Sequence, residues 1–97
     1  MTRLQLSDPV FDDLVRIAEH LHAHDVYDVE ARLAEILGAL GILTEHPLIG
    51  TRVAHGRREL VIGRVGRGYV ALYAYDPLDD VVVVAALRAQ REAGFAD

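Results

Sequence analysis

Two apolar runs in the last third of the chain give its clearest pattern of hydrophobic and polar positions. Tyr69–Tyr75 and Val81–Leu87 are rich in valine and tyrosine, whereas Asp76–Asp80 between them holds a proline and three aspartates. Branched and aromatic side chains suit a pleated strand, and aspartate and proline suit turns, so the pattern predicts a β-hairpin. Because the second run is apolar at consecutive positions, we expect a central strand with both faces covered by other elements.

The first half of the chain shows helical periodicity instead. Ser7-Asp8-Pro9 predicts a helix start, because Ser or Asp can accept a hydrogen bond from a free first-turn N–H and proline is tolerated there. A second helix is expected from Asp25 to about Leu40. Two adjacent amphipathic helices predict an antiparallel hairpin whose apolar stripes pack against each other or against a sheet. The stripes comprise Val10, Leu14, Ile17 and Leu21 in the first helix and Val29, Leu33, Ile36, Leu37 and Leu40 in the second.

Shorter patterns complete the order of elements. Alternating leucines predict a strand at Thr2–Leu6. The His46–Gly50 segment interrupts the helical pattern with a proline and a glycine, and a loop is expected from there through Gly56. Arg58–Gly63 is typical of a strand, with Arg64–Gly68 as the turn that follows it. The order is therefore β-α-α-β-β-β, which predicts a single α+β domain over residues 1–97.

Charge is distributed unevenly along the chain. The formal net charge is −5, yet Met1–Pro47 has three arginines against nine acidic residues, whereas Leu48–Tyr75 has five arginines against Glu59 alone. There is no lysine and no cysteine, so neither a disulfide framework nor a cysteine-based metal site is expected. Without a signal-like or membrane-spanning segment, we expect a soluble cytoplasmic protein that does not enter a membrane.

Four segments taken together resemble the RelE/ParE superfamily of bacterial type II toxins. They are His46–Gly50, Arg58–Ile62, Gly68–Tyr73 and Leu87–Phe95, and the likeness extends over essentially the whole chain. The resemblance implies a helical hairpin packed on a small, strongly twisted antiparallel sheet. It also implies a cognate antitoxin as partner in a hetero-oligomer, operator DNA bound only through that antitoxin, a role in growth inhibition and plasmid stabilisation, and no cofactor.

The superfamily contains two activities. RelE-like members cut messenger RNA on the ribosome, and ParE-like members poison DNA gyrase. Val70 stands where RelE-like chains commonly carry arginine, Ala89 where relatives often carry histidine, and Phe95 near a frequent C-terminal tyrosine. Since alanine cannot transfer a proton, we expect ParE-like binding to gyrase. A ribosome-dependent endoribonuclease and a non-toxic relative in an autoregulatory complex with antitoxin on DNA are the alternatives, so enzymatic activity stays open.

A cationic cluster is the main candidate site for target or antitoxin binding. It comprises Arg57, Arg58, Arg88, Gln90 and Arg91, because strands of a sheet can bring these positions to one end. Guanidinium groups grip phosphate or carboxylate in two places at once. In a nuclease, the arginines at 58, 88 and 91 would stabilise phosphate charge. The alternative is that the arginines pair with nearby glutamates and with carboxylates of the antitoxin.

Histidines and tyrosines offer weaker candidates. His55, in the loop before the paired arginines, is a possible general base or a solvated loop residue. His20, His22 and His24 end the first helix and are interpreted as complementing its dipole rather than binding metal, so no metal site is predicted. Tyr69, Tyr73 and Tyr75 alternate along one strand and are interpreted as packing residues rather than as a platform for bases, and Arg52, Arg64 and Arg67 as solvated loop charges.

Overall fold

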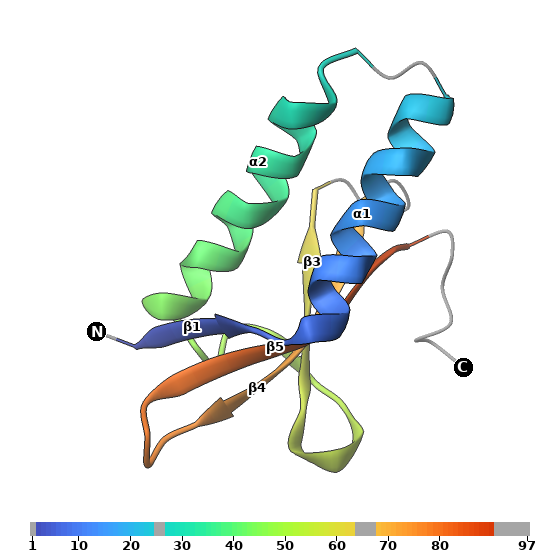
Figure 1. The fold of residues 1–97 in the computed structure, drawn as a ribbon. Helices are drawn as coiled ribbons and strands as arrows, with labels where there is room; N and C mark the ends of the chain where they lie inside the picture. Colours follow the sequence, from blue (N-terminus) through green and yellow to red (C-terminus); the bar gives the residue numbers. More distant parts are fainter. Residues whose placement is uncertain (1, 25–26, 64–67, 91–97) are drawn as a thin grey trace.

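The computed structural model describes residues 2–24, 27–63 and 68–90 and places two antiparallel helices over a five-stranded sheet (Figure 1). The helices are α1 (Asp8–Ala23) and α2 (Val29–Gly41), and the strands are β1 (Arg3–Leu6), β2 (Thr51–Arg52), β3 (Arg58–Ile62), β4 (Tyr69–Asp76) and β5 (Val81–Ala89). A single 3₁₀ turn occurs at Ile42–Thr44, and Ala54–Gly56 forms a short turn with non-helical backbone angles at His55. The predicted α+β order is confirmed, with the two-residue strand β2 added. Neither helix is long and apolar enough to cross a bilayer in the part of the chain that is described.

The sheet has the order β1-β5-β4-β3-β2 and is mixed. Strands β2 to β5 pair antiparallel along this order, but β1 runs parallel to β5, with Leu4 opposite Val82 and Leu6 opposite Val84. A parallel pair needs a long crossover connection, which the helical hairpin and the strands β2 to β4 supply here. The expectation of a wholly antiparallel sheet therefore misses β1. The middle strand is β4, and β5 is an interior strand beside it.

One face of the sheet carries the core. Directly opposed residues share a face, and the pairs Ala71 with Leu87 and Tyr73 with Val84 are fully buried beneath the helices. The helices contribute most of the apolar positions that the sequence predicted, including Ile36 at 2% exposure and Leu40 at 0%, but Leu37 faces solvent instead. Burying each such side chain contributes about 1.5–3 kcal/mol to folding.

The other face of the sheet has no helix over it among the described residues, so within this part of the chain only one face of β5 is covered, contrary to the expectation. We call this the open sheet face. Its apolar side chains are half-buried, apart from one that is 50% exposed, Val61. On this side Val83 and Ala86 of β5 are apolar, yet no described element packs over them. The open sheet face comprises Val61, Val70, Leu72, Val83 and Ala86.

Helix α1 completes the edge of β5 where β1 ends. Strand β1 pairs only with Val81–Val84, and beyond that point side chains supply the missing partners. The hydroxyl of Ser7 donates to the carbonyl of Ala85, Asp13 Oδ2 accepts from the N–H of Leu87 at 2.9 Å, and Arg16 donates to the Leu87 carbonyl. The Ser7 hydroxyl thus binds the sheet. The sequence suggested that it would accept a hydrogen bond from a first-turn N–H of α1, and it does not.

Helix α2 begins at Val29, four residues after the predicted start. Asp28 adopts a left-handed conformation with φ 59°, and its carboxylate accepts a hydrogen bond from the N–H of Ala31 at 3.0 Å. A short polar side chain tolerates that conformation and satisfies one of the free N–H groups of the first turn. Asp28 therefore fixes the start of the helix, while Asp25 lies outside the described residues.

Candidate functional site

The loop His46–Gly50 is held on the end of the sheet by two side chains from β3 and β4. Arg58 donates from Nη1 to the carbonyl oxygens of Leu48 at 3.0 Å and Gly50 at 2.8 Å. The buried hydroxyl of Tyr73 accepts a hydrogen bond from the N–H of Gly50 at 2.9 Å. A Cβ at position 50 would lie 2.7 Å from the Tyr73 hydroxyl and 2.8 Å from the carbonyl of Glu59, so only glycine fits. The loop is consequently fixed in place.

Beside this loop lies a cationic depression, which we call the arginine hollow. It has a volume of about 220 Å³, and Arg52, Arg57 and Arg58 line it together with Leu48 and Tyr75. Arg52 of β2 lies opposite Arg58 of β3 in the strand register. Like charges directly opposite each other destabilise a strand pair, and an anion between them would remove that repulsion. The side chains of Arg52 and Arg57 form no hydrogen bond or ion pair with any other described residue.

A tight turn joins β2 to β3 and brings these arginines together. His55 and Gly56 at its centre have φ values of 64° and 70°, and the N–H of Val53 donates to the carbonyl of Arg57 at 2.9 Å. Two successive positive φ angles characterise the type I′ hairpin turn, which matches the twist of paired strands. The turn places His55 at an exposed tip, outside the lining of the arginine hollow.

Tyr75 connects the arginine hollow to the turn between β4 and β5. Its hydroxyl donates to Asp80 Oδ1 at 2.8 Å, and the hydroxyl of Thr2 donates to the same oxygen at 2.7 Å. The hydrogen bonds from Thr2 and then Tyr75 hold the pKa of Asp80 below its ordinary value, and the bond to Asp80 raises the pKa of Tyr75. The tyrosine therefore stays protonated, and its hydroxyl proton is committed to the carboxylate.

The structure brings only part of the predicted cationic cluster together. Arg57 and Arg58 share the arginine hollow, but Arg58 lies opposite Tyr73 of β4, whereas Arg88 lies opposite Val70. Three residues along β4 separate these positions, or about 10 Å, and an odd separation puts them on opposite faces. The expectation that Arg58 and Arg88 meet at one end of the sheet is therefore wrong, because β4 lies between their strands.

The remaining predicted members lie where β5 ends. The N–H of Gln90 donates to the carbonyl of Gly68, and its side-chain oxygen accepts from the N–H of the same glycine, at 3.0 and 3.3 Å. Gln90 therefore ties the end of β5 to the start of β4. Arg91 lies outside the described residues. Arg52, in contrast, belongs to the arginine hollow although the sequence suggested a solvated charge. The His-Gly pair at 55 and 56, a hairpin-turn signal, is what could have revealed its place.

Other candidates resolve as local structure. The imidazoles of His20 and His24 stack with centroids 4.2 Å apart, and His24 Nδ1 lies 2.9 Å from the carbonyl oxygen of His20 at the end of α1. Across the described ranges, no three histidine, cysteine, aspartate or glutamate side chains are grouped closely enough to hold a metal ion. Tyr73 is fully buried, and Tyr69 and Tyr75 pack against the core on the helix-covered face, as the packing interpretation predicted.

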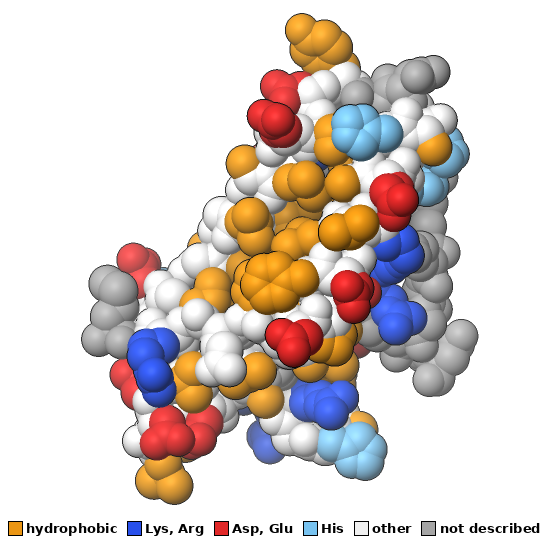
Figure 2. Space-filling view, in the orientation of Figure 1, with side chains coloured by type: hydrophobic (Ala, Val, Ile, Leu, Met, Phe, Trp, Pro, Cys, Tyr) orange, Lys and Arg blue, Asp and Glu red, His pale blue; other side chains and the backbone are white. Residues whose placement is uncertain are grey.

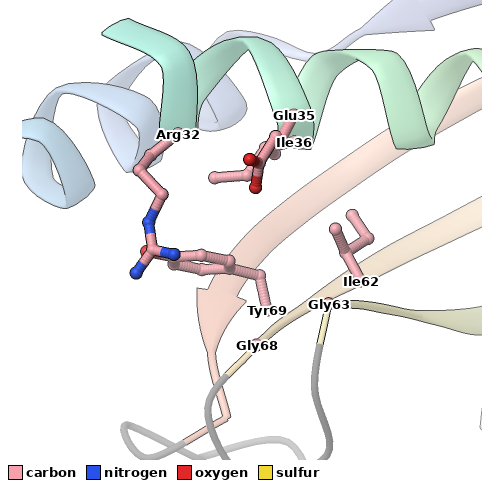
Figure 3. Close-up of a pocket in the computed structure, with 7 residues that line it drawn as sticks. All are labelled: Arg32, Glu35, Ile36, Ile62, Gly63, Gly68 and Tyr69. Atoms are coloured by element: carbon pink, nitrogen blue, oxygen red, sulfur yellow. The ribbon is translucent and has the colours of Figure 1, made fainter. Parts of the chain in front are cut away.

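A second depression lies between α2 and the ends of β3 and β4 (Figure 3). It has a volume of about 360 Å³, and Figure 3 shows Arg32 reaching down from α2 with its guanidinium beside the ring of Tyr69. Glu35 also projects into this space from the same helix. Because residues 64–67, which follow β3, lie outside the described part, we assign no ligand to it.

The helical hairpin also presents apolar side chains to solvent. Figure 2 shows hydrophobic side chains gathered along the line between α1 and α2. Phe11 and Val15 of α1 are 53% and 59% exposed, and Leu37 of α2 is 44% exposed. We call these three residues the helical surface. Apolar side chains that cluster on a surface are typical of interaction sites.

Comparison with solved structures places this fold among toxin–antitoxin proteins. A chain of the chromosomal ParDE toxin–antitoxin system from P. aeruginosa superposes with a TM-score of 0.74 at 15% identity, covering 92% of this chain and 96% of that one. A chain of the RelBE2 toxin–antitoxin complex from Mycobacterium tuberculosis gives 0.58 at 20% identity, with coverages of 91% and 96%. These likenesses show a shared fold. No curated protein sequence matches the chain.

The sequence itself matches the family described as the ParE toxin of the type II toxin–antitoxin system parDE, over residues 4–94. That match takes in every described helix and nearly all of the sheet. The chain therefore belongs to the ParE toxin family, and the resemblance drawn from its sequence motifs is confirmed.

Proposed function

We propose that this chain inhibits bacterial growth by binding and poisoning DNA gyrase, and that a cognate antitoxin neutralises it. The observation that carries the proposal is the composition of the arginine hollow. Among the described residues its lining has three guanidinium groups but no histidine, aspartate or glutamate, and the hydroxyl proton of its tyrosine is held by Asp80. Such a site can bind an anionic group, but its lining contains no group free to exchange a proton with a substrate.

Ribonuclease chemistry would need a proton-transfer group near the cations. A 2′-hydroxyl has to lose its proton as it attacks phosphorus, and the leaving oxygen has to gain one. His55 lies outside the lining of the arginine hollow, and Val70 and Ala89 stand where the superfamily resemblance implies functional side chains. Arg58 is also committed to two backbone carbonyls of the loop. These features support a binding toxin over an RNA-cutting enzyme, and the cytoplasm is its proposed place of action.

The antitoxin is proposed to cover the helical surface with an apolar segment. Phe11, Val15 and Leu37 are too exposed to contribute much to folding, yet they lie on neighbouring helices. Both solved relatives come from toxin–antitoxin assemblies, which supports a hetero-oligomer of this chain with its antitoxin. We further propose that operator DNA is contacted through the antitoxin and that stabilisation of a plasmid follows from growth inhibition once antitoxin is lost.

Induced expression without antitoxin tests the proposal. Growth should stop while ribosome-bound messenger RNA stays intact, and covalent gyrase–DNA complexes should accumulate. Mapping of RNA 5′ ends shows whether messages are cut, and an immunoblot for gyrase bound to DNA shows whether gyrase is trapped. Codon-phased cuts in translated messages with free gyrase would overturn the proposal in favour of the endoribonuclease. Unchanged growth at confirmed high expression would point to the non-toxic, autoregulatory alternative.

A further inference from the structure

We infer that the end of the sheet around β2 and β3 is a receptor for a short acidic peptide segment of another protein. Its carboxylates would lie in the arginine hollow, and a neighbouring apolar side chain would lie on an adjoining surface that we call the apolar ledge. The apolar ledge comprises Pro47, Leu48 and Ile49. The inference concerns the ligand chemistry of this surface and holds whichever protein supplies the segment.

The charge of the arginine hollow favours an acidic ligand. Arg52 and Arg57 are exposed, and their side chains have no partner among the described residues. Arg58 donates to the loop carbonyls through Nη1. Three guanidinium groups around one depression repel each other until an anion arrives. Arginine's planar fork matches the two oxygens of a carboxylate. A ligand carboxylate would thus convert a local repulsion into paired, charge-assisted hydrogen bonds.

The apolar ledge favours an apolar side chain next to the carboxylates of the ligand. Leu48 and Ile49 are 57% and 56% exposed, and with Pro47 they border a shallow depression of about 470 Å³. Leu48 lines both this depression and the arginine hollow, so the two lie next to each other. Arg58 and Tyr73 already fix the loop that carries the ledge. A fixed loop loses little conformational entropy when a ligand binds, which favours recognition there.

Acidic residues at the borders restrict the ligand to a locally charged peptide rather than a nucleic acid. Asp80 receives the hydroxyl of Tyr75, whose ring lines the arginine hollow, and Asp76 also acts on that hydroxyl electrostatically. Glu45 lines the same depression as the apolar ledge. A nucleic acid repeats its charge at every phosphate and would run into these carboxylates. A segment with two or three carboxylates beside a leucine avoids them.

Fluorescence anisotropy with a defined probe tests the inference on the purified full chain. The probe is a fluorescein-labelled peptide of two leucines followed by three glutamates, compared with the same peptide carrying glutamines and with a single-stranded RNA of about ten nucleotides. We expect the glutamate peptide alone to bind well. The double variant Arg52→Gln/Arg57→Gln should weaken its binding by about tenfold or more, because two charge-assisted contacts are lost. Raising salt from about 50 to about 300 mM should weaken it as well.

The matched control is Arg32→Gln, which removes an exposed arginine of α2 that does not line the arginine hollow and should leave binding unchanged. Leu48→Ser removes an exposed ledge side chain without touching a charge and should also weaken binding. Thermal melting checks that each variant folds. Equal binding of the glutamine peptide, no effect of the double variant, or RNA bound more tightly through the same arginines would each overturn the inference. Growth inhibition is not read out, so a failure here leaves the gyrase proposal standing.

Discussion

Single side chains, more than strand pairing, hold α1 to the sheet. Asp13 and Arg16 lie one turn apart on the helix, and together they satisfy the backbone N–H and carbonyl of Leu87, which strand β1 does not reach. The two side chains also contact each other at 3.4 Å. Polar side chains of a helix thus replace a missing edge strand, and sequence patterning gives no signal for such a contact because Asp13 looks like any residue of a polar helix face.

Replacing Asp13 with alanine should therefore destabilise the protein. The N–H of Leu87 would lose its acceptor at a part-buried position of β5, which costs about 1–3 kcal/mol of unfolding free energy. Urea unfolding followed by circular dichroism measures the change. Asp12→Ala is the matched control, since Asp12 is the exposed neighbour in the same helix and no side-chain hydrogen bond involves it. Equal stability of the two variants would show that the Asp13 contact contributes nothing.

Elements with strong periodicity were predictable, whereas short elements were not. The stripes of both helices and the valine-rich runs of β4 and β5 gave the right element types, because burial of a continuous face requires that spacing. Strand β2 has only two residues and no periodicity. The parallel pairing of β1 depends on how the helical hairpin carries the chain across the sheet, and the place of Arg52 depends on the turn that follows it. Such features arise from tertiary geometry.

Two glycines, Gly50 in the loop His46–Gly50 and Gly38 in α2, should respond in opposite ways to replacement by alanine. Gly50→Ala should destabilise the protein by about 1–3 kcal/mol, because the new methyl group would overlap the Tyr73 hydroxyl and a β3 carbonyl. Gly38→Ala, where nothing lies within 4 Å, should instead stabilise α2 by about 0.5–1 kcal/mol through helix propensity. Midpoints of chemical unfolding compare them. A neutral Gly50→Ala would mean that Tyr73 does not fix the loop.

The hydrogen bonds at the turn between β4 and β5 should make the folding stability depend on pH. The pKa of Asp80 is lowered in the fold, so its stabilising effect is complete above the unfolded pKa near 3.8 and is lost as pH falls through the lower folded value. The pKa of Tyr75 is raised, so its contribution is complete below about 10 and is lost as pH rises through the folded value. Asp80→Asn should lower the melting temperature near neutral pH, with the difference shrinking in acid.

Asparagine is the suitable replacement because position 80 has φ 53°, a left-handed conformation that asparagine tolerates. Melting curves from about pH 2 to pH 7 measure the difference between the two proteins. A gap that stays constant across that range would show that the Asp80 carboxylate is not linked to folding. Tyr75→Phe removes one of the two hydrogen-bond donors to Asp80. It should make the loss of stability in acid smaller without abolishing it.

At the scale of the whole molecule, distinct surfaces flank one small core. The helical surface is apolar, the open sheet face is apolar with few charges, and the end of the sheet combines the arginine hollow with the apolar ledge. A chain of 97 residues whose faces are this exposed is suited to binding other proteins. The sequence indicated the toxin fold and an arginine-rich segment, but the separation of Arg58 from Arg88 by β4 became evident only from the sheet order.

The most direct test of the central claim is a supercoiling assay with purified gyrase, relaxed plasmid and ATP, to which the purified chain is added in increasing amounts. The account predicts that supercoiling stops and that linear DNA appears after protease treatment, because gyrase is trapped with its DNA cleaved. The same chain mixed beforehand with its antitoxin should have no effect. Full supercoiling at a large excess of folded chain, together with codon-phased cuts in messenger RNA on ribosomes, would contradict the account.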